Sequence, residues 1–370
     1  MRGYRSGMSS ASWFLRLVLI LFISTSAMAQ QFALKAEQQA KLRDLITKDK
    51  AAGRQFARVQ GEAEEALTAT PNSVKIIESE GKLKSDPDRI TTVKSLADMR
   101  KIEALGWAFA LTSKAEYGNK AKAFIFAWAR VNEPQGDPIN ETKLEPLLVG
   151  YDLTQDAFSA PEKAEVEAWL RKIASTLIDR QKKKNKATSF NNWHSHRLKM
   201  LGLCGWLLQD SELIDRAVNG FREQIANNLQ PDGSSFDFHE RDALHYHCYD
   251  LEPLLALATA AKQQGTDLYQ FTGTNGASLA KAVEFLVPYC DGSKTHAEFV
   301  NSEVEFDRKR SEAGQREFAT GKLFDPKDAL EVLELACMFD NRFAPLIASL
   351  KGKKTSRFTS WQTVLNEVRR

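Results

Sequence analysis

The sequence lacks the short motifs by which several large enzyme classes are identified. It contains no phosphate-binding P-loop, no G-x-G-x-x-G dinucleotide motif and no G-x-S-x-G nucleophile motif. Cysteine is scarce, and its four copies, Cys204, Cys248, Cys290 and Cys337, form no C-x-x-C pair. A zinc cluster or a thioredoxin-like redox site is therefore not expected. An exported chain can form disulfides, but the apolar helical surroundings of Cys204 and Cys337 favour buried free thiols.

Long apolar runs are also scarce, and the only clear one stands near the N-terminus. Leu17 to Ile23 form an apolar run that follows three arginines and precedes the small residues around Ala27-Met28-Ala29. This order of basic, apolar and small residues is typical of a secretory signal peptide. We predict that residues 1–29 are a signal peptide, that residues 30–370 form a single domain, and that the protein is periplasmic or secreted. An uncleaved N-terminal anchor is the alternative, although the run is short for a membrane span.

An excess of charge of one sign is missing from the expected mature chain. Three of the 51 basic residues lie in the predicted signal peptide, which leaves 48 basic against 48 acidic residues. This balance gives no reason to expect nucleic acid as a partner. Because no second long apolar stretch is present, we expect no membrane association after signal cleavage. No obligate protein partner is predicted, and attraction for an anionic polymer has to come from local clusters of charge.

Sustained alternation of apolar and polar residues is absent, so the chain is expected to form helices and not strands. Apolar residues at helical spacing predict helices over 36–68, 92–113, 118–132, 160–181, 194–208, 211–227, 245–264, 277–289, 326–339 and 342–350. Short polar connections between many of them favour antiparallel helix pairs. Longer segments without this pattern cover 69–91, 133–146, 182–193, 228–240 and 290–312. Long loops in a compact helical domain are often functional.

Histidine is scarce as well, and five of the six copies fall in two short segments. The first segment reads SFNNWHSHR and ends at Arg197. Its amides can donate hydrogen bonds to a carboxylate, and an imidazole or guanidinium beside them can neutralise that carboxylate. The candidate site residues of this segment are Asn191, Asn192, Trp193, His194, His196 and Arg197. The alternative is that an asparagine caps a helix and that Trp193 belongs to the core.

The second segment reads HERDALHYHCY and ends at Tyr249, so that it combines an arginine with histidines and tyrosines. On a helix, His245 and Tyr249 are four residues apart and share one face. Phenol, imidazole and guanidinium groups together suit proton transfer beside a carboxylate. The candidates of this segment are Arg241, His245, Tyr246 and Tyr249. The alternative is that one of the tyrosines packs as a core aromatic side chain.

Neither segment has the spacing that a metal site usually needs. Two histidines of each segment stand two residues apart, and such residues point away from each other on a helix. We therefore predict no metal and no cofactor. A basic run at 180–186, which includes Lys184, leads directly into the first segment. This run either is a solvated loop or steers an anionic polymer toward the site.

Several of these segments together resemble the alginate lyase domain, a family of α-toroid polysaccharide lyases that includes polysaccharide lyase family 5. The similarity runs from about Ser73 to Asp291. Its parts are GKLKSDPDR at 81–89, Trp128, the GDPIN run that ends at Asn140, the pair Asn191-Asn192, and ALHYHCYDLEPL at 243–254. The last block is the most specific, because it resembles the family pattern in which an arginine precedes A-L-x-Y-H-x-Y and a Leu-x-Pro-Leu helix.

The resemblance implies an all-α fold, an incomplete (α/α) toroid of antiparallel helix pairs, and β-elimination on an acidic polysaccharide. The substrate would be a 1,4-linked polyuronate such as alginate, polymannuronate or a glucuronate polymer. The family places an asparagine, a histidine and an arginine around the uronate carboxylate and a tyrosine at the glycosidic oxygen. Carried onto this sequence, the tyrosine falls on Tyr249 and the asparagine on Asn191 or Asn192, and the catalytic candidates are Asn192, His194, Arg241 and Tyr249. The substrate-binding candidates are Asn191, Trp193, His196, Arg197, His245, Tyr246, Trp128, Asn140 and Lys184.

Tyr249 is the best candidate for the acid that protonates the departing oxygen, and the base is either Tyr249 or His194. A phenol normally titrates near ~10, so a basic role requires cationic neighbours that lower its pKa. Arg241 and a protonated His194 are expected to supply that charge.

Two positions depart from the family 5 pattern. The family histidine directly follows the two asparagines, whereas Trp193 stands in that place here and His194 comes next. The family arginine lies seven residues before the tyrosine, whereas that place holds Asp242 here and Arg241 is one residue earlier.

Two other functions stay open on the sequence alone. A glycoside hydrolase on a similar toroid needs two carboxylic acids across the cleft. The acids available near the second segment are Asp237, Glu240, Asp242 and Asp250. A non-catalytic, periplasmic polyuronate-binding protein would use the basic run and Trp193.

Overall fold

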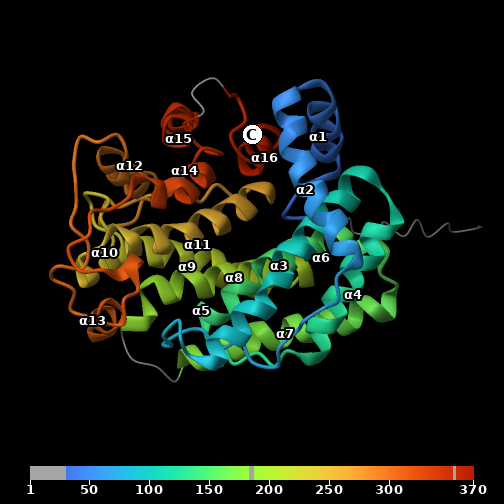
Figure 1. The fold of residues 1–370 in the computed structure, drawn as a ribbon, viewed down its shortest axis with the longest axis horizontal. Coiled ribbons are helices and arrows are strands. Elements are labelled where there is room, and N and C mark those ends of the chain that lie inside the picture. The colour runs from blue at the N-terminus through green and yellow to red at the C-terminus, as the bar shows by residue number, and fades with distance from the viewer. Residues whose placement is uncertain (1–30, 183–186, 353–355) are drawn as a thin grey trace, which may run out of the picture.

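The computed structural model describes residues 31–182, 187–352 and 356–370 (Figure 1). Over these ranges the chain forms helices and no β-strand, with three isolated β-bridges between loop residues. The predicted all-α class is therefore confirmed. The proposed signal peptide at 1–29 lies outside the described residues.

The helices follow one another with short connections. The N-terminal half consists of α1 (Ala36–Lys48), α2 (Lys50–Thr68), α3 (Pro87–Thr112), α4 (Ala115–Val131), α5 (Pro138–Glu141), α6 (Glu145–Thr154) and α7 (Ala160–Lys182). The C-terminal half consists of α8 (Asn192–Leu208), α9 (Ser211–Asn228), α10 (Phe236–Arg241), α11 (Leu244–Gln263), α12 (Leu279–Cys290), α13 (Glu305–Glu312), α14 (Leu330–Ala336), α15 (Ala344–Leu350) and α16 (Trp361–Arg369).

Successive helices pair and curl into an incomplete (α/α) toroid, as the sequence predicts. The closest pairs are α3 with α6 and α8 with α9, and α11 packs on α8. The chain curls back on itself, so that α16 packs against both α1 and α2 (Figure 1). One hydrophobic core cluster accordingly includes residues from Phe32 to Val368.

Helix boundaries follow capping residues more closely than the apolar pattern. The helix predicted over 36–68 is two helices, because Asp49 ends the first and caps the second by accepting from the backbone N–H of Ala51 at 2.7 Å. Helix α3 begins at Pro87, five residues before the predicted start. Asp86 caps it and the proline takes the first helical position.

Five helices were not predicted. Helix α6 is buried over most of its surface and has no polar stripe to reveal its period. Helix α13 is short and almost wholly charged, and it lies inside the segment 290–312 that the sequence presents as a loop. Helices α5, α10 and α16 were missed as well, and α10 lies largely inside the segment 228–240 that the sequence presents as a loop. Helices α5, α10 and α13 matter for function, because each carries a residue that lines the pocket described below.

All four cysteines are buried free thiols, as the apolar reading of their surroundings predicts. Within the ranges that the structure describes, no helix has the length and apolar character needed to cross a bilayer.

Candidate active site

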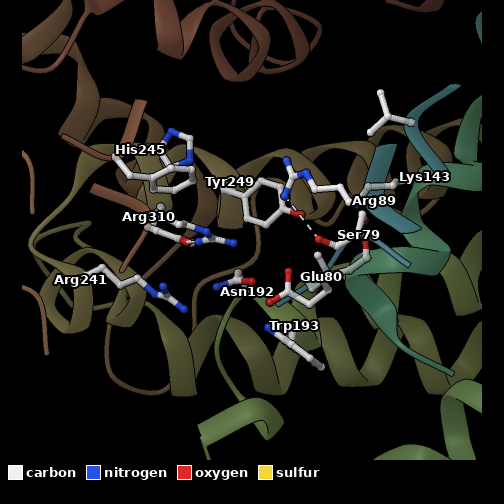
Figure 2. Close-up of a pocket in the computed structure, with 14 residues that line it drawn as sticks. Ser79, Glu80, Arg89, Lys143, Asn192, Trp193, Arg241, His245, Tyr249 and Arg310 are labelled. Carbon is white, nitrogen blue, oxygen red and sulfur yellow. Dashed lines mark hydrogen bonds between the residues drawn. The ribbon is translucent and has the colours of Figure 1, made fainter. Parts of the chain in front are cut away.

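The two histidine-containing segments meet at a pocket of about 200 Å³ (Figure 2). Helices α3, α5, α8, α10, α11 and α13 contribute to its wall, together with the segment before α3 and the short turns that carry Lys143 and Phe318. Its lining residues are Ser79, Glu80, Arg89, Val93, Ile139, Lys143, Asn192, Trp193, Arg241, His245, Tyr246, Tyr249, Arg310 and Phe318.

The two asparagines at the start of α8 have different tasks. The side chain of Asn191 caps the helix by accepting from the backbone N–H of Trp193 at 3.1 Å, and Asn191 is not part of the pocket wall. Asn192, one residue later, lines the pocket, and its side-chain amide donates to the carboxylate of Asp237. Trp193 lines the pocket beside it. The capping alternative therefore accounts for Asn191 alone.

The structure does not bring His194 into the pocket. His194 lines a separate groove against α9, together with Glu212 and Asp215. Its Nδ1 atom lies 3.1 Å from a guanidinium nitrogen of Arg197, and burial together with this positive charge lowers the pKa of His194 to about 3. Consecutive helical residues point about 100° apart, so the single step from Trp193 to His194 turns the imidazole out of the site.

His196 and Arg197 also lie behind the pocket wall. The Nδ1 atom of His196 is 2.9 Å from the Thr142 hydroxyl, and its ring packs against the ring of Tyr249 in a tilted arrangement at a centroid distance of 4.5 Å. Arg197 is 1% exposed and donates to the backbone oxygen of Thr188. His196 and Arg197 therefore support the site from within and do not reach a ligand in this pocket.

The arginine before Tyr249 stands one residue earlier than in the family 5 pattern, and the turn between α10 and α11 accommodates this shift. Asp242 ends α10 in the left-handed region, with φ of 48°, and its carboxylate accepts from the backbone N–H of Asn301 at 2.8 Å. Asp242 therefore faces the 290–304 segment. Arg241 reaches the pocket instead, and its guanidinium donates to Asp307 at 2.7 Å and lies 4.0 Å from the ring centre of Tyr246.

Tyr246 holds two pocket side chains together. Its hydroxyl accepts from the guanidinium of Arg310 at 2.6 Å and lies 3.4 Å from the carboxylate of Asp307. Burial raises the pKa of Tyr246 to about 12, although Arg241 opposes this shift. Tyr246 therefore keeps its proton at neutral pH and is a hydrogen-bonding partner of the Arg310 guanidinium.

Tyr249 and His245 share one face of α11, as predicted, and both line the pocket. Burial raises the pKa of the Tyr249 phenol, and the negative charge of Glu80 adds to the rise. This is opposite to the lowering expected from cationic neighbours, so Tyr249 keeps its proton at neutral pH. Burial lowers the pKa of His245 to about 4, which leaves a neutral imidazole.

A third chain segment, just before and within α3, completes the pocket. The amide oxygen of Asn140 accepts from the backbone N–H groups of Ser79 and Glu80 at 3.1 and 3.0 Å. Asn140, a substrate-binding candidate in the sequence, therefore positions the segment that carries Glu80. Arg89 is held nearby, because its guanidinium donates to the backbone oxygen of Lys82 at 2.9 Å.

Four pocket residues carry a positive charge or can do so: Arg89, Lys143, Arg241 and Arg310. Burial lowers the pKa of Lys143 to about 8, and the charge of Glu80 opposes this shift. Among the described residues of the wall, Glu80 alone carries a carboxylate. The pocket therefore suits an anionic ligand, and a hydrolase pair of carboxylic acids does not face it.

Arg89 lies in the 81–89 block that supports the family resemblance, and Arg310 lies on α13, in the segment 290–312 that the sequence presents as a loop. No short motif indicates Glu80 or Lys143. Lys184 lies outside the described residues. In the ranges that the structure describes, no group of three or more His, Cys, Asp or Glu side chains is arranged to hold a metal ion.

Trp128 is fully buried, and its indole N–H donates to Asp98 at 3.1 Å, so it belongs to the core and not to the pocket. We expect Trp128→Ala to lower the free energy of unfolding by about 3–5 kcal/mol, measured by denaturant titration. Trp193→Ala, in the pocket wall, is the matched control and should cost much less. Unchanged stability in Trp128→Ala would contradict a core role.

The fold and the pocket together define an all-α toroid of the class that contains polysaccharide lyases, with a cationic pocket that holds a protonated tyrosine. The chain belongs to the alginate lyase family, whose family model matches residues 41–296.

Individual relatives agree with this family. A polysaccharide lyase from Stenotrophomonas maltophilia (strain K279a) is 27% identical over 150 residues, which span 40% of this chain and 44% of the relative. The match therefore covers less than half the length of that protein.

Solved structures of alginate lyases share the fold at low identity. An alginate lyase from Bacteroides ovatus superposes with a TM-score of 0.67 and 16% identity, over 91% of this chain and 99% of that chain. Alginate lyase A1-III from Sphingomonas species A1 superposes with a TM-score of 0.54 and 20% identity, over 72% of this chain and 79% of that chain.

Proposed function

We propose that the protein cleaves a 1,4-linked polyuronate by β-elimination and leaves an unsaturated uronate at the new end. The observation that carries this proposal is the protonated phenol of Tyr249 in a pocket with four cationic side chains. A polyuronate supplies the anionic ligand that such a pocket needs, and its elimination requires an acid beside a neutralised carboxylate.

The first requirement of the reaction is stabilisation of charge. The C5 proton of a uronate is weakly acidic because it is α to a carboxylate, and removing it places further charge on that group. Asn192, Arg241 and Arg310 line one part of the pocket and can donate hydrogen bonds to this carboxylate. Arg310 thus neutralises the substrate carboxylate in place of His194, which does not reach the pocket.

The second requirement is proton transfer. A base takes the C5 proton, the C4–C5 double bond forms, and the C4–O bond breaks as the departing oxygen receives a proton. Tyr249 is the donor, since its raised pKa keeps the phenol protonated. Two other pocket groups can accept the C5 proton without first losing one of their own: the imidazole of His245 and the carboxylate of Glu80.

The distribution of charge favours a polymer with a carboxylate on each sugar. Arg241 and Arg310 lie on one side of Tyr249 (Figure 2). Arg89 and Lys143 lie on the other side. With the phenol at the scissile bond, each cationic pair can meet a uronate on its own side of that bond. This arrangement supports alginate, polymannuronate or a related glucuronate polymer as the substrate.

The solved relatives lend support to a polymeric substrate. A histidine-to-alanine variant of alginate lyase A1-III is known as a complex with a tetrasaccharide, and it superposes on this chain with a TM-score of 0.56. That complex motivates the use of uronate oligosaccharides as ligands for this protein.

The test is a screen of acidic polysaccharides by ultraviolet absorbance. A lyase generates the absorbance of an unsaturated uronate from the polymer. New reducing ends without this absorbance would indicate a hydrolase and overturn the proposal. Binding without either product would indicate a polyuronate-binding protein.

We further propose that the protein acts in the periplasm or outside the cell, on the basis of the N-terminal run described above. Intact-mass measurement of protein recovered from the periplasm or culture medium is expected to show a chain that starts near Gln30. A full-length chain retained in the cytosol would contradict export.

A further inference from the structure

Two carboxylates lie buried directly behind the pocket wall. Asp237 on α10 and Asp250 on α11 are both 0% exposed. The carboxylate of Asp237 accepts from the backbone N–H of Asn192 at 2.9 Å and also from the side-chain amide of Asn192. The amide of Asn228 on α9 donates to Asp237 at 3.1 Å and lies 3.4 Å from Asp250. Asp237 is thus the group that touches the pocket residue Asn192 from behind.

The two carboxylates are not equivalent. Asp250 accepts from the hydroxyl of Ser195 at 2.6 Å, but its second oxygen is buried without a hydrogen-bond partner among the described residues. Asp237 receives donors on both of its oxygens. Within the described ranges neither carboxylate forms an ion pair with a basic side chain, and two unpaired charges buried together are costly. The pair therefore carries a single negative charge, with Asp237 ionised and Asp250 protonated.

The electrostatics of the surrounding elements agree with this division. Burial and the charge of Asp237 hold the pKa of Asp250 well above its usual range. Burial raises the pKa of Asp237 to about 6, while the amides of Asn192 and Asn228 and the charge of Arg241 limit the rise. Glu240, on the same helix, adds to the rise. At neutral pH the pair then carries one proton.

We propose that Asp237 is a positioning residue for the elimination. Its carboxylate holds the side-chain amide of Asn192 with the nitrogen atom toward Asp237, which leaves the second N–H of that nitrogen free to donate to the substrate carboxylate. This inference rests on the proposed function. An ionised carboxylate can only accept hydrogen bonds, so it pins the amide nitrogen. A protonated Asp237 can donate instead and stabilise the reversed amide, whose oxygen would repel the substrate carboxylate.

The proposal predicts an acid limit, which means that turnover is lost at low pH. Because the positioning form of Asp237 is ionised, turnover should fall as the pH drops through about 6, where Asp237 gains its proton. Asp237→Asn should lower kcat by about tenfold to a hundredfold with a smaller change in KM, since it misplaces a transition-state donor. The variant should also lose the acid limit near this pH.

Asp250→Asn is the matched control. It replaces a carboxyl that is already protonated with a neutral group of the same shape, so it should keep both the wild-type kcat and the acid limit. A double-mutant cycle with Asn192→Ala completes the kinetic test, because Asp237→Asn should cost little further activity once the amide is gone. Wild-type kcat in Asp237→Asn, or an equal loss in Asp250→Asn, would overturn the assignment.

A second measurement needs no turnover and so separates this proposal from the proposed reaction. In the ¹⁵N-labelled full chain, the side-chain amide of Asn192 is assigned by its loss in Asn192→Ala. Its resonances should titrate with a midpoint near pH 6, the pKa of Asp237. The titration should persist in Asp250→Asn and vanish in Asp237→Asn. An Asn192 amide that does not respond between pH 5 and pH 8 would overturn the proposal even if polyuronate cleavage is established.

Discussion

Tyr249→Phe is expected to lower kcat by about two or more orders of magnitude while leaving substrate affinity largely intact. The substitution removes one hydroxyl and keeps the ring, which packs against the His196 ring at a centroid distance of 4.5 Å, so the packing of α11 should change little. The hydroxyl is the proton donor in the proposed reaction, and the pocket wall contains no second phenol that is free to replace it, since Tyr246 is bonded to Arg310 at 2.6 Å. The measurement is the initial rate and affinity on the best polyuronate found by the screen.

Tyr246→Phe is the matched control on the same helix. Losing its hydroxyl loosens Arg310 but removes no reacting group, so we expect a loss of about tenfold or less, seen mainly in KM. A larger loss of kcat in Tyr246→Phe than in Tyr249→Phe would exchange their assigned roles. Full activity in both variants would remove tyrosine from the mechanism and leave His245 and Glu80 as the groups to test.

Arg241→Ala is expected to weaken both binding and turnover, with a loss in kcat/KM of about a hundredfold or more. In the proposed reaction the guanidinium binds the substrate carboxylate in the ground state as well as in the transition state. Its removal also leaves Asp307, which is 1% exposed, without its 2.7 Å partner. The measurement is steady-state kinetics, accompanied by thermal unfolding to separate lost affinity from lost stability.

Arg308→Ala provides the comparison for Arg241→Ala. Arg308 lies on α13 and donates to the backbone oxygen of Ser302, but it does not line the pocket. Removal of this charge should leave kcat/KM nearly unchanged. Equal losses in the two variants would mean that the general positive charge of α10 and α13, and not the contact made by Arg241, governs the reaction.

Much of the fold could be predicted from the sequence, because helical periodicity and short connections are local signals. The limits of this prediction are visible at α6 and α13. Helix α6 is buried nearly all round, so it has no amphipathic period, and α13 has almost no apolar residue. The break at Asp49 also escaped detection, because a cap inside a long helical pattern is outweighed by the residues around it.

The candidate site was predicted where its residues are close in the sequence. Asn192, Arg241, His245 and Tyr249 all reach one pocket. His194 shows the limit of this reasoning, because one step along α8 separates a wall residue from a residue that faces α9. Sequence spacing alone does not show which face of α8 is turned toward the pocket.

The remaining pocket residues come from segments far apart in the chain. Glu80, Lys143 and Arg310 lie in or beside stretches that appear as loops in the sequence, and only the closure of the toroid brings them to Tyr249. Glu298 illustrates the same point, because its carboxylate accepts from the backbone N–H groups of Leu244 and His245 at 2.8 and 3.0 Å. This cap on α11 comes from 54 residues away and has no local signal.

The central claim is that cleavage is an elimination in which Tyr249 donates the proton. Mass spectrometry of the two products from a defined polyuronate tetrasaccharide tests it most directly. The account predicts that wild-type enzyme yields one fragment lighter than its saturated counterpart by one water, and that Tyr249→Phe yields almost none of it. Two fragments that both carry the full saturated mass, formed by an enzyme that uses water, would contradict the account.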